Sequence, residues 1–223
     1  MRTITVLLCV GAFACMSVPA VAVERLIALT FDDGPSPETT LKLLDILKRY
    51  GVCATFFVIG NNAKEYPGIV EREKAECHVV ANHSMTHPHL RIPFMSEVAV
   101  ASQFGRASNA IAAALKLKDV VPAYARVPGC AKSRSITAAL SWFTVVKCGV
   151  DPRDWVLSRR SARLVANYVL ANATAGEPVL LHDIRPTTVA AVPAIIEGLW
   201  ARGFRLVTVA ELYGRPAYMP KSD

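Results

Sequence analysis

Several features are missing from this chain, and each absence argues against a class of protein. After the first residues, no apolar stretch reaches the roughly 20 residues that a bilayer-spanning helix needs, so no further transmembrane segment is expected. The basic residues form no run interleaved with aromatic residues, which argues against nucleic-acid binding. No C-x-x-C pair occurs, which argues against a zinc site built from cysteines. Repeats, low-complexity tracts and linkers are also absent.

The composition is that of one folded, basic domain. A chain of 223 residues is long enough for one sizeable core, and 52% hydrophobic against 19% charged residues argues against disorder. The formal charge of +7 arises from 25 basic and 18 acidic residues. Such a surface favours encounter with anionic polymers, although scattered basic residues are also typical of an ordinary solvated surface.

The first 22 residues have the features of a secretion signal. Arg2 supplies the positive start, residues 4–16 form an apolar stretch, and Ala20-Val21-Ala22 supplies the small-x-small cleavage pattern. The alternative, a membrane anchor, is disfavoured because the apolar stretch is short. We therefore predict cleavage after Ala22 and a mature domain over 23–223 that is secreted, periplasmic or held in the cell envelope.

The mature sequence alternates short apolar runs, typical of buried strands, with longer amphipathic stretches, typical of helices. Residues 37–50 form the clearest helical pattern, and we expect Ser36 to cap its start and Gly51 to follow its end. The other expected helices are 96–115, 162–171 and 189–201. The expected strands are 26–31, 54–59, 78–81, 123–127, 144–150, 179–182 and 205–208.

This alternation favours an α/β fold with a parallel sheet and helices outside it. The pattern does not choose between a closed barrel and an open, doubly wound sheet. In both arrangements the active groups lie at the carboxyl ends of the strands. Polar residues that follow the expected strands are therefore the candidates for a functional site.

Two carboxylates follow the first expected strand. Adjacent side chains on an extended segment point to opposite sides, so Asp32 and Asp33 are expected to take different roles, one on a metal and one as a base. The succeeding Gly34-Pro35 is also typical of an ordinary turn, so the pair carries weight only together with other residues.

Two histidines follow the third expected strand. His83 and His87 are four residues apart, which would place them on one side of a helical turn, and imidazole is a common ligand of zinc-like ions. His78 begins that strand and is expected to be structural, whereas His89 is a weaker candidate ligand.

Charged residues also follow later strands. Arg126 lies near a strand end, where a guanidinium can hold a carboxylate in place. Asp151 and Asp154 follow the fifth expected strand, and His182 ends the sixth. Convergence of such side chains at one edge of the sheet is how barrel enzymes assemble an active site.

These residues fall into five motifs, through which the chain resembles the polysaccharide deacetylases that share the NodB-homology domain. The similarity runs from about residue 24 to residue 212. The motifs are, in order, Thr30-Phe31-Asp32-Asp33-Gly34-Pro35, His83-Ser84-Met85-Thr86-His87, Arg126-Val127-Pro128, Asp151-Pro152-Arg153-Asp154-Trp155 and Leu180-Leu181-His182.

The resemblance implies a distorted, TIM-barrel-like (β/α) barrel with about seven parallel strands. It implies a metal-dependent hydrolase that removes N-acetyl groups from a GlcNAc- or MurNAc-containing polysaccharide or oligosaccharide. It also implies one divalent ion, with zinc expected and cobalt or another ion as alternatives. The implied site residues are the metal ligands Asp33, His83 and His87, the general base Asp32, the general acid His182, the orienting residues Arg126 and Asp151, and the substrate-binding residues Gly129, Trp155 and Leu180.

Other functions remain as alternatives. An O-acetyl esterase acting on xylan or another acetylated glycan would use the same site. An inactive carbohydrate-binding relative would lack a ligand or a catalytic group, and none is missing here. A two-histidine, one-carboxylate iron oxygenase is a further alternative. The β-then-α pattern and the additional Asp32 and His182 argue against it.

Two positions depart from the family pattern. Gly129 stands where many members have an aromatic residue, which removes a side-chain wall and leaves the substrate open. Cys77 stands where glycine is common, and Cys53 precedes the neighbouring strand. Because neighbouring strands lie about 4.8 Å apart, we predict a Cys53–Cys77 bridge at the end of the sheet where the strands start. Four cysteines in the mature chain allow three pairings, and with this bridge Cys130 and Cys148 would form the other pair.

Overall fold

The computed structural model describes residues 24–89, 91–157 and 161–221. The secretion signal predicted for residues 1–22 lies outside the described residues. Among the described residues, no helix combines the length and the apolar character that crossing a membrane requires.

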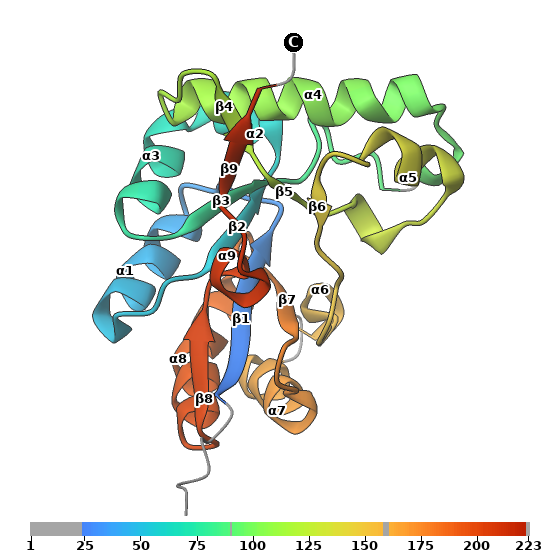
Figure 1. Cartoon of the computed structure of the whole chain (residues 1–223). Helices are drawn as coiled ribbons and strands as arrows, with labels where there is room; N and C mark the ends of the chain where they lie inside the picture. The colour runs from blue at the N-terminus through green and yellow to red at the C-terminus, as the bar shows by residue number, and fades with distance from the viewer. Residues whose placement is uncertain (1–23, 90, 158–160, 222–223) are drawn as a thin grey trace, which may run out of the picture.

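A parallel sheet forms the centre of the molecule (Figure 1). Its strands lie in the order β6-β5-β3-β2-β1-β7, and β8 pairs with β1. The first half of β1 pairs with β8, and its second half pairs with β2 and β7. The strand bounds are β1 Arg25–Asp32, β2 Thr55–Val58, β3 Val79–Asn82, β5 Tyr124–Ala125, β6 Thr144–Val145, β7 Pro178–His182 and β8 Phe204–Val207.

The sheet curls into a partial barrel. Of the two predicted arrangements, it therefore corresponds to the barrel and not to the open, doubly wound sheet. At one edge β6 pairs with β5, and at the other edge Val150 forms a parallel bridge with Val179 of β7. The single strand predicted over 144–150 is therefore divided into β6 and an isolated bridge. Gly149 marks the break, because it has a φ of 64° and a Cβ there would overlap the Pro178 carbonyl.

Helices cover the outside of the sheet (Figure 1). The four predicted helices correspond to α1, α4, α7 and α8. The helix bounds are α1 Thr40–Tyr50, α2 Gly60–Glu65, α3 Pro67–Ala75, α4 Glu97–Ala114, α5 Arg134–Ala139, α6 Asp154–Leu157, α7 Ala162–Asn172, α8 Pro186–Trp200 and α9 Val209–Tyr213, with 3-10 turns at Ile92–Phe94 and Pro128–Cys130.

The predicted start of α1 is wrong and its predicted end is confirmed. The helix begins at Thr40, and Ser36 does not cap it; the Ser36 N–H instead donates to Thr40 Oγ1 at 2.8 Å. Gly51 ends the helix in the left-handed conformation, with a φ of 64°. A small antiparallel pair, β4 (Val120–Pro122) with β9 (Tyr218–Pro220), was not predicted.

Both predicted disulfides are present. Cys53 and Cys77, with Cα atoms 5.6 Å apart, lie where β2 and β3 start. Cys130 and Cys148, with Cα atoms 6.3 Å apart, join the segment after β5 to the segment after β6. One bridge therefore closes the starting end of the sheet, and the other lies beyond the carboxyl end of β5.

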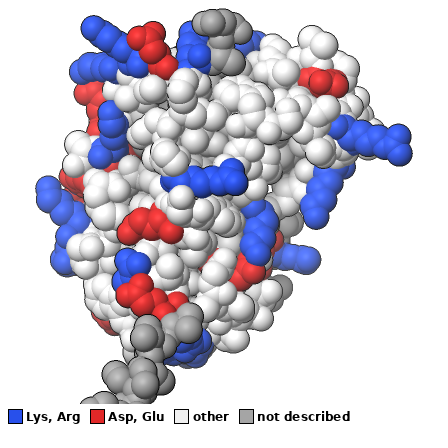
Figure 2. Space-filling view, viewed as in Figure 1, with Lys and Arg blue, Asp and Glu red and all other residues white. Residues whose placement is uncertain are grey.

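The surface and the interior follow the expected division. Every residue of β2 and β3 is buried, as expected for a parallel sheet covered by helices. Figure 2 shows Lys and Arg side chains dispersed over the visible face, with Asp and Glu among them. On that face the positive charge has the distribution expected of a solvated surface.

Candidate active site

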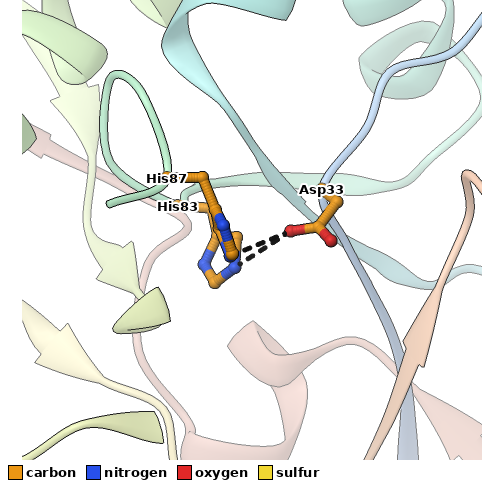
Figure 3. Close-up of side chains that lie close together, drawn as sticks. All are labelled: Asp33, His83 and His87. Atoms are coloured by element: carbon orange, nitrogen blue, oxygen red, sulfur yellow. Dashed lines mark ion pairs between the residues drawn. The ribbon is translucent and has the colours of Figure 1, made fainter. Parts of the chain in front are cut away.

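The three predicted metal ligands meet beyond the carboxyl ends of the strands. In Figure 3, His83 and His87 lie side by side and point toward Asp33. Asp33 Oδ1 lies 3.4 Å from His83 Nε2 and 3.2 Å from His87 Nε2. This carboxylate oxygen is buried and has no hydrogen-bond partner of good geometry. Two imidazoles and an unpartnered carboxylate oxygen form a donor set that fits a divalent ion such as zinc.

The backbone after β1 brings both carboxylates to this site. The strand ends at Asp32, and Asp33 leaves it with a φ of 78°. Asp32 Oδ2 lies 3.6 Å from His83 Nε2, the same nitrogen that Asp33 approaches. The expectation that the two side chains point to opposite sides is therefore wrong, because it assumed an extended backbone through Asp33.

The two histidines reach the site from a loop rather than from the expected helical turn. The residues from His83 to His87 are not helical, and His87 has a positive φ of 52°. Gln103 on α4 holds the loop, because its Oε1 accepts hydrogen bonds of 3.1 Å from the backbone N–H groups of Met85 and Thr86. The imidazoles thus converge through this loop geometry, which their four-residue spacing does not specify.

The charges in this cluster favour an ionised Asp33. Burial opposes its ionisation, but the close approach and charge of the His83 imidazole, with His87 nearby, hold the pKa of Asp33 well below its usual range. Burial would lower the pKa of His83, yet the carboxylates of Asp32 and Asp33 outweigh burial and raise it. The His83 Nδ1 lies 2.9 Å from the Arg126 carbonyl oxygen, which orients Nε2 toward the site.

Asp32 and Arg126 form a buried ion pair. Arg126 Nη1 lies 2.7 Å from Asp32 Oδ1, and the side chains are 1% and 3% exposed. The same nitrogen donates to Thr30 Oγ1 at 2.8 Å, and the guanidinium lies 4.2 Å from the Phe57 ring centroid. The structure therefore places Arg126 beside the carboxylate that it was expected to orient, and it leaves Asp32 Oδ2 facing His83.

His182 lies near the second carboxylate oxygen of Asp33, with its Nε2 3.9 Å from Asp33 Oδ2. Its Nδ1 lies 2.6 Å from Asp154 Oδ1, and its backbone N–H donates to Asp154 Oδ2 at 2.8 Å. Asp154 is fully buried and also accepts a hydrogen bond of 2.8 Å from Thr188 Oγ1. Burial would lower the pKa of His182, but the hydrogen bond and charge of Asp154 outweigh it and raise the pKa to about 9.

The residue expected to orient His182 needs correction. The resemblance assigned this role to Asp151, but the hydrogen bonds to His182 come from Asp154. Asp151 instead accepts a hydrogen bond of 2.7 Å from the Arg153 N–H. Helix α6 starts at Asp154, so the chain has turned after Asp151, and the carboxylate three residues later is the one that reaches His182.

The predicted substrate-binding residues lie in different settings. Leu180 is buried in β7, and Trp155, in α6, is 51% exposed. Gly129 has a φ of 63°, and a Cβ there would lie 3.6 Å from the Cβ of His89. The His89 ring is in turn 5.4 Å from the His87 ring, measured between centroids. Gly129 and His89 therefore lie together at the edge of the metal site.

Sequence reasoning missed one buried carboxyl group next to the site. Asp183 follows His182 and is fully buried. Thr40 Oγ1 donates to its Oδ2 at 2.5 Å, and burial raises the pKa of Asp183 to about 7 despite that hydrogen bond. The available signal was an acidic residue directly after a strand end, which also matches an ordinary turn.

Comparisons with known proteins identify the family to which the chain is similar. A family model described as polysaccharide deacetylase matches residues 21–145. The chain is 37% identical over 204 residues to the peptidoglycan-N-acetylglucosamine deacetylase PgdA of Listeria monocytogenes, covering 92% of this chain and 42% of that protein. It therefore spans less than half the length of that relative. It is also 39% identical over 199 residues to a chitooligosaccharide deacetylase of Rhizobium leguminosarum bv. trifolii, covering 82% and 89% of the two chains.

Solved structures give the same result. A family 4 acetyl xylan esterase from Clostridium thermocellum, solved in complex with a cobalt ion, superposes with a TM-score of 0.79. Its sequence is 30% identical, and the match covers 86% of this chain and 94% of that one. The fold and the sequence together show that this chain belongs to the polysaccharide deacetylase family.

Proposed function

We propose that this protein is a metal-dependent deacetylase that hydrolyses N-acetyl groups on GlcNAc- or MurNAc-containing glycans. One observation carries the proposal. The cluster of Asp33, His83 and His87 lies between two further pairs of side chains. These pairs are Asp32 with Arg126 and His182 with Asp154. The names of the relatives support N-acetylated glycans as the substrate class.

Asp33, His83 and His87 would hold the ion, and zinc is the expected metal. A three-ligand site of this type leaves coordination positions open to water and substrate. When bound, the ion supplies Lewis-acid polarisation of the acetyl carbonyl and lowers the pKa of water. Cobalt is the alternative, because a related esterase was solved with that ion.

Asp32 would act as the general base. Its Oδ1 is engaged by Arg126, so Oδ2 is the oxygen available to accept a proton from the attacking water. That oxygen lies 3.6 Å from His83 Nε2, which places it beside the metal ligands. The buried ion pair keeps the carboxylate in one orientation, and Arg126 would in this way position the base.

His182 would act as the general acid. Asp154 holds its Nδ1, which directs Nε2 toward Asp33 and the reacting acetamide. With a pKa of about 9, the imidazole is protonated at neutral pH and can donate to the leaving amine. Asp32 ends β1 and His182 ends the neighbouring strand β7, so the proposed base and the proposed acid both lie beside Asp33.

The substrate contacts complete the proposal. Trp155 and Leu180 would line the apolar space for the acetyl methyl group. A backbone N–H near Gly129 would donate to the oxyanion of the tetrahedral intermediate. With the signal predicted for residues 1–22 cleaved, the mature enzyme would meet its glycan outside the cytoplasm.

The test measures acetate release from N-acetylated chitooligosaccharides, peptidoglycan and acetylated xylan, with chelator and after zinc is added back. We expect release from at least one N-acetylated glycan, its loss with chelator and its recovery with zinc. His83→Ala should be inactive, whereas Asp151→Asn, whose carboxylate does not contact His182, should retain activity. Absence of acetate release from every glycan by the zinc-loaded protein would contradict the proposal.

An O-acetyl esterase is the second candidate. It is favoured by the structural similarity to the acetyl xylan esterase from Clostridium thermocellum. Ester and amide hydrolysis differ in the leaving group. The oxygen of an ester departs more readily without a proton than the nitrogen of an amide, which must be protonated to leave as an amine. An O-esterase should therefore release acetate from xylan and not from chitooligosaccharides, and it should depend less on His182.

A further inference from the structure

The turn after β1 determines where the metal carboxylate points. This turn, Asp33–Ser36, starts with Asp33 at a φ of 78°. Positive φ is uncommon for residues other than glycine and persists where the surroundings hold it in place. The groups that clamp the turn therefore also fix the direction of the Asp33 side chain.

Asn62 and Ile59 clamp one side of the turn. Asn62 Nδ2 donates to the Asp33 carbonyl oxygen at 2.8 Å, and the Ile59 N–H donates to the Gly34 carbonyl oxygen at 3.0 Å. These two bonds fix the carbonyl oxygens of Asp33 and Gly34, and the rest of the turn is held by other residues.

Thr40 and Asp183 hold that opposite side. The Ser36 N–H donates to Thr40 Oγ1 at 2.8 Å, and the same hydroxyl donates to Asp183 Oδ2 at 2.5 Å. The Asp183 carboxylate also lies directly against Gly34, since a Cβ added there would overlap it. Asp183 thus contacts the turn directly through Gly34 and indirectly through Thr40.

Stability alone does not account for a carboxyl group at this place. Asp183 is 0% exposed, and its Oδ1 is buried with no hydrogen-bond partner. A buried polar atom without a partner is costly, and an apolar side chain would fill the same space without that cost. What the carboxyl group provides, and an apolar side chain would not, is Oδ2 as the hydrogen-bond acceptor for the Thr40 hydroxyl.

We propose that Asp183 and Thr40 are positioning residues for the metal site, which fix the Asp33–Ser36 turn and through it the Asp33 carboxylate. This inference rests on the proposed metal-dependent function. Neither residue reaches the metal ligands through its own hydrogen bonds, so the effect passes through the backbone of the turn.

The test compares zinc affinity in two pairs of variants of the mature chain, by competition with a chelating dye. Thr40→Val removes both hydrogen bonds of the hydroxyl, and Thr40→Ser keeps them. Asp183→Ala removes the acceptor, and Asp183→Asn keeps an oxygen for Thr40. We expect Thr40→Val and Asp183→Ala to raise the zinc Kd about tenfold, and their conservative partners to stay within about threefold of the parent.

Circular dichroism of the metal-free proteins checks that the fold is kept, and Glu73→Gln is the matched control. Glu73 is also a fully buried carboxyl group, and no hydrogen bond links its carboxyl group to the turn, so this variant should keep the parent Kd. Should Asp183→Ala fail to fold, the Thr40 pair decides alone.

The outcomes separate the two proposals. Folded Thr40→Val that binds zinc as tightly as the parent would overturn the positioning role and leave the proposed function intact. An equal loss of affinity in Glu73→Gln would also overturn it, because the effect would then be a general one of buried carboxyl groups. A parent chain that binds no zinc would overturn the proposed function and this inference together.

Discussion

The two ends of the curled sheet each hold a largely buried histidine, and the surroundings of each histidine shift its pKa in opposite directions. At the starting end, burial lowers the pKa of His78 to about 4, and its Nδ1 accepts a hydrogen bond of 3.0 Å from the Ala54 N–H. At the finishing end, Asp154 outweighs burial and raises the pKa of His182 to about 9. The same side chain is thus a neutral acceptor at one end and a charged donor at the other.

The difference shows how one fold divides its tasks. The starting end, where Cys53 and Cys77 are bonded, uses its polar groups to join neighbouring strands. The finishing end gathers carboxylates and imidazoles around Asp33, whose Oδ1 has no hydrogen-bond partner. Stability and chemistry should therefore respond separately to changes at the two ends.

The largest expected effect is on chemistry at the finishing end. Replacing Asp32 by Asn keeps the shape but removes the proposed base, so kcat/KM for acetate release should fall by about 10²–10⁴. The thermal midpoint should change little by comparison. Asp45→Asn is the control, because Asp45 is a surface carboxylate that pairs with Arg72. An Asp32→Asn enzyme as fast as the parent would remove Asp32 from the mechanism.

The converse change removes a bridge at the starting end. Replacing Cys53 and Cys77 together by Ala opens a loop with a sequence separation of 24 residues. Chain entropy predicts a loss of about 3.5 kcal/mol in the free energy of unfolding. Urea denaturation measures it, and kcat/KM at 25 °C should stay unchanged. A matching fall in kcat/KM would show that the two ends are not independent.

The buried His78 predicts how acid affects stability. Its folded pKa of about 4 lies below the unfolded value of 6.5, so between these pH values only the unfolded chain takes up the proton. This contribution is complete above pH 6.5 and is lost as the pH falls toward 4, and it amounts to about 3 kcal/mol. His78→Asn keeps an acceptor for Ala54 and should lose this part of the pH dependence in urea titrations. An unchanged slope between pH 6.5 and 4 would contradict the assignment.

The same contrast explains what the sequence could predict. Buried parallel strands are continuous apolar runs, so the seven strands of the sheet were found, and the polar residues at their ends gave Asp33, His83 and His87. The pair β4 and β9 was missed because each strand has only three residues and ends in proline, which is not typical of a strand within a sheet. Backbone conformation was missed as well, since the positive φ of Asp33 and His87 depends on tertiary contacts.

The residue that bonds to His182, the proposed acid, was misassigned for a related reason. Asp151 and Asp154 are three residues apart in one motif, and sequence position alone could not show which of them reaches His182. Asp183 gave no stronger signal, because an acidic residue after a strand also matches a turn. The roles of both Asp154 and Asp183 depend on hydrogen bonds to elements distant in the sequence, β7 for one and α1 for the other.

The smallest expected effect distinguishes the two acidic residues of that motif. Without the carboxylate of Asp154, burial is opposed only by Asp32 and Asp33, so the pKa of His182 should fall from about 9 toward its ordinary value of 6.5. At a pKa of 6.5 the protonated fraction at pH 8 would fall from about nine-tenths to about one-thirtieth, so Asp154→Asn should lose up to about 30-fold in kcat/KM there and less than about twofold at pH 6. Asp151→Asn should follow the parent profile at both pH values, because its carboxylate bonds to Arg153. The opposite result would be that Asp151→Asn, and not Asp154→Asn, lowers kcat/KM at pH 8. In that case a group other than Asp154 would be responsible for the raised pKa of His182.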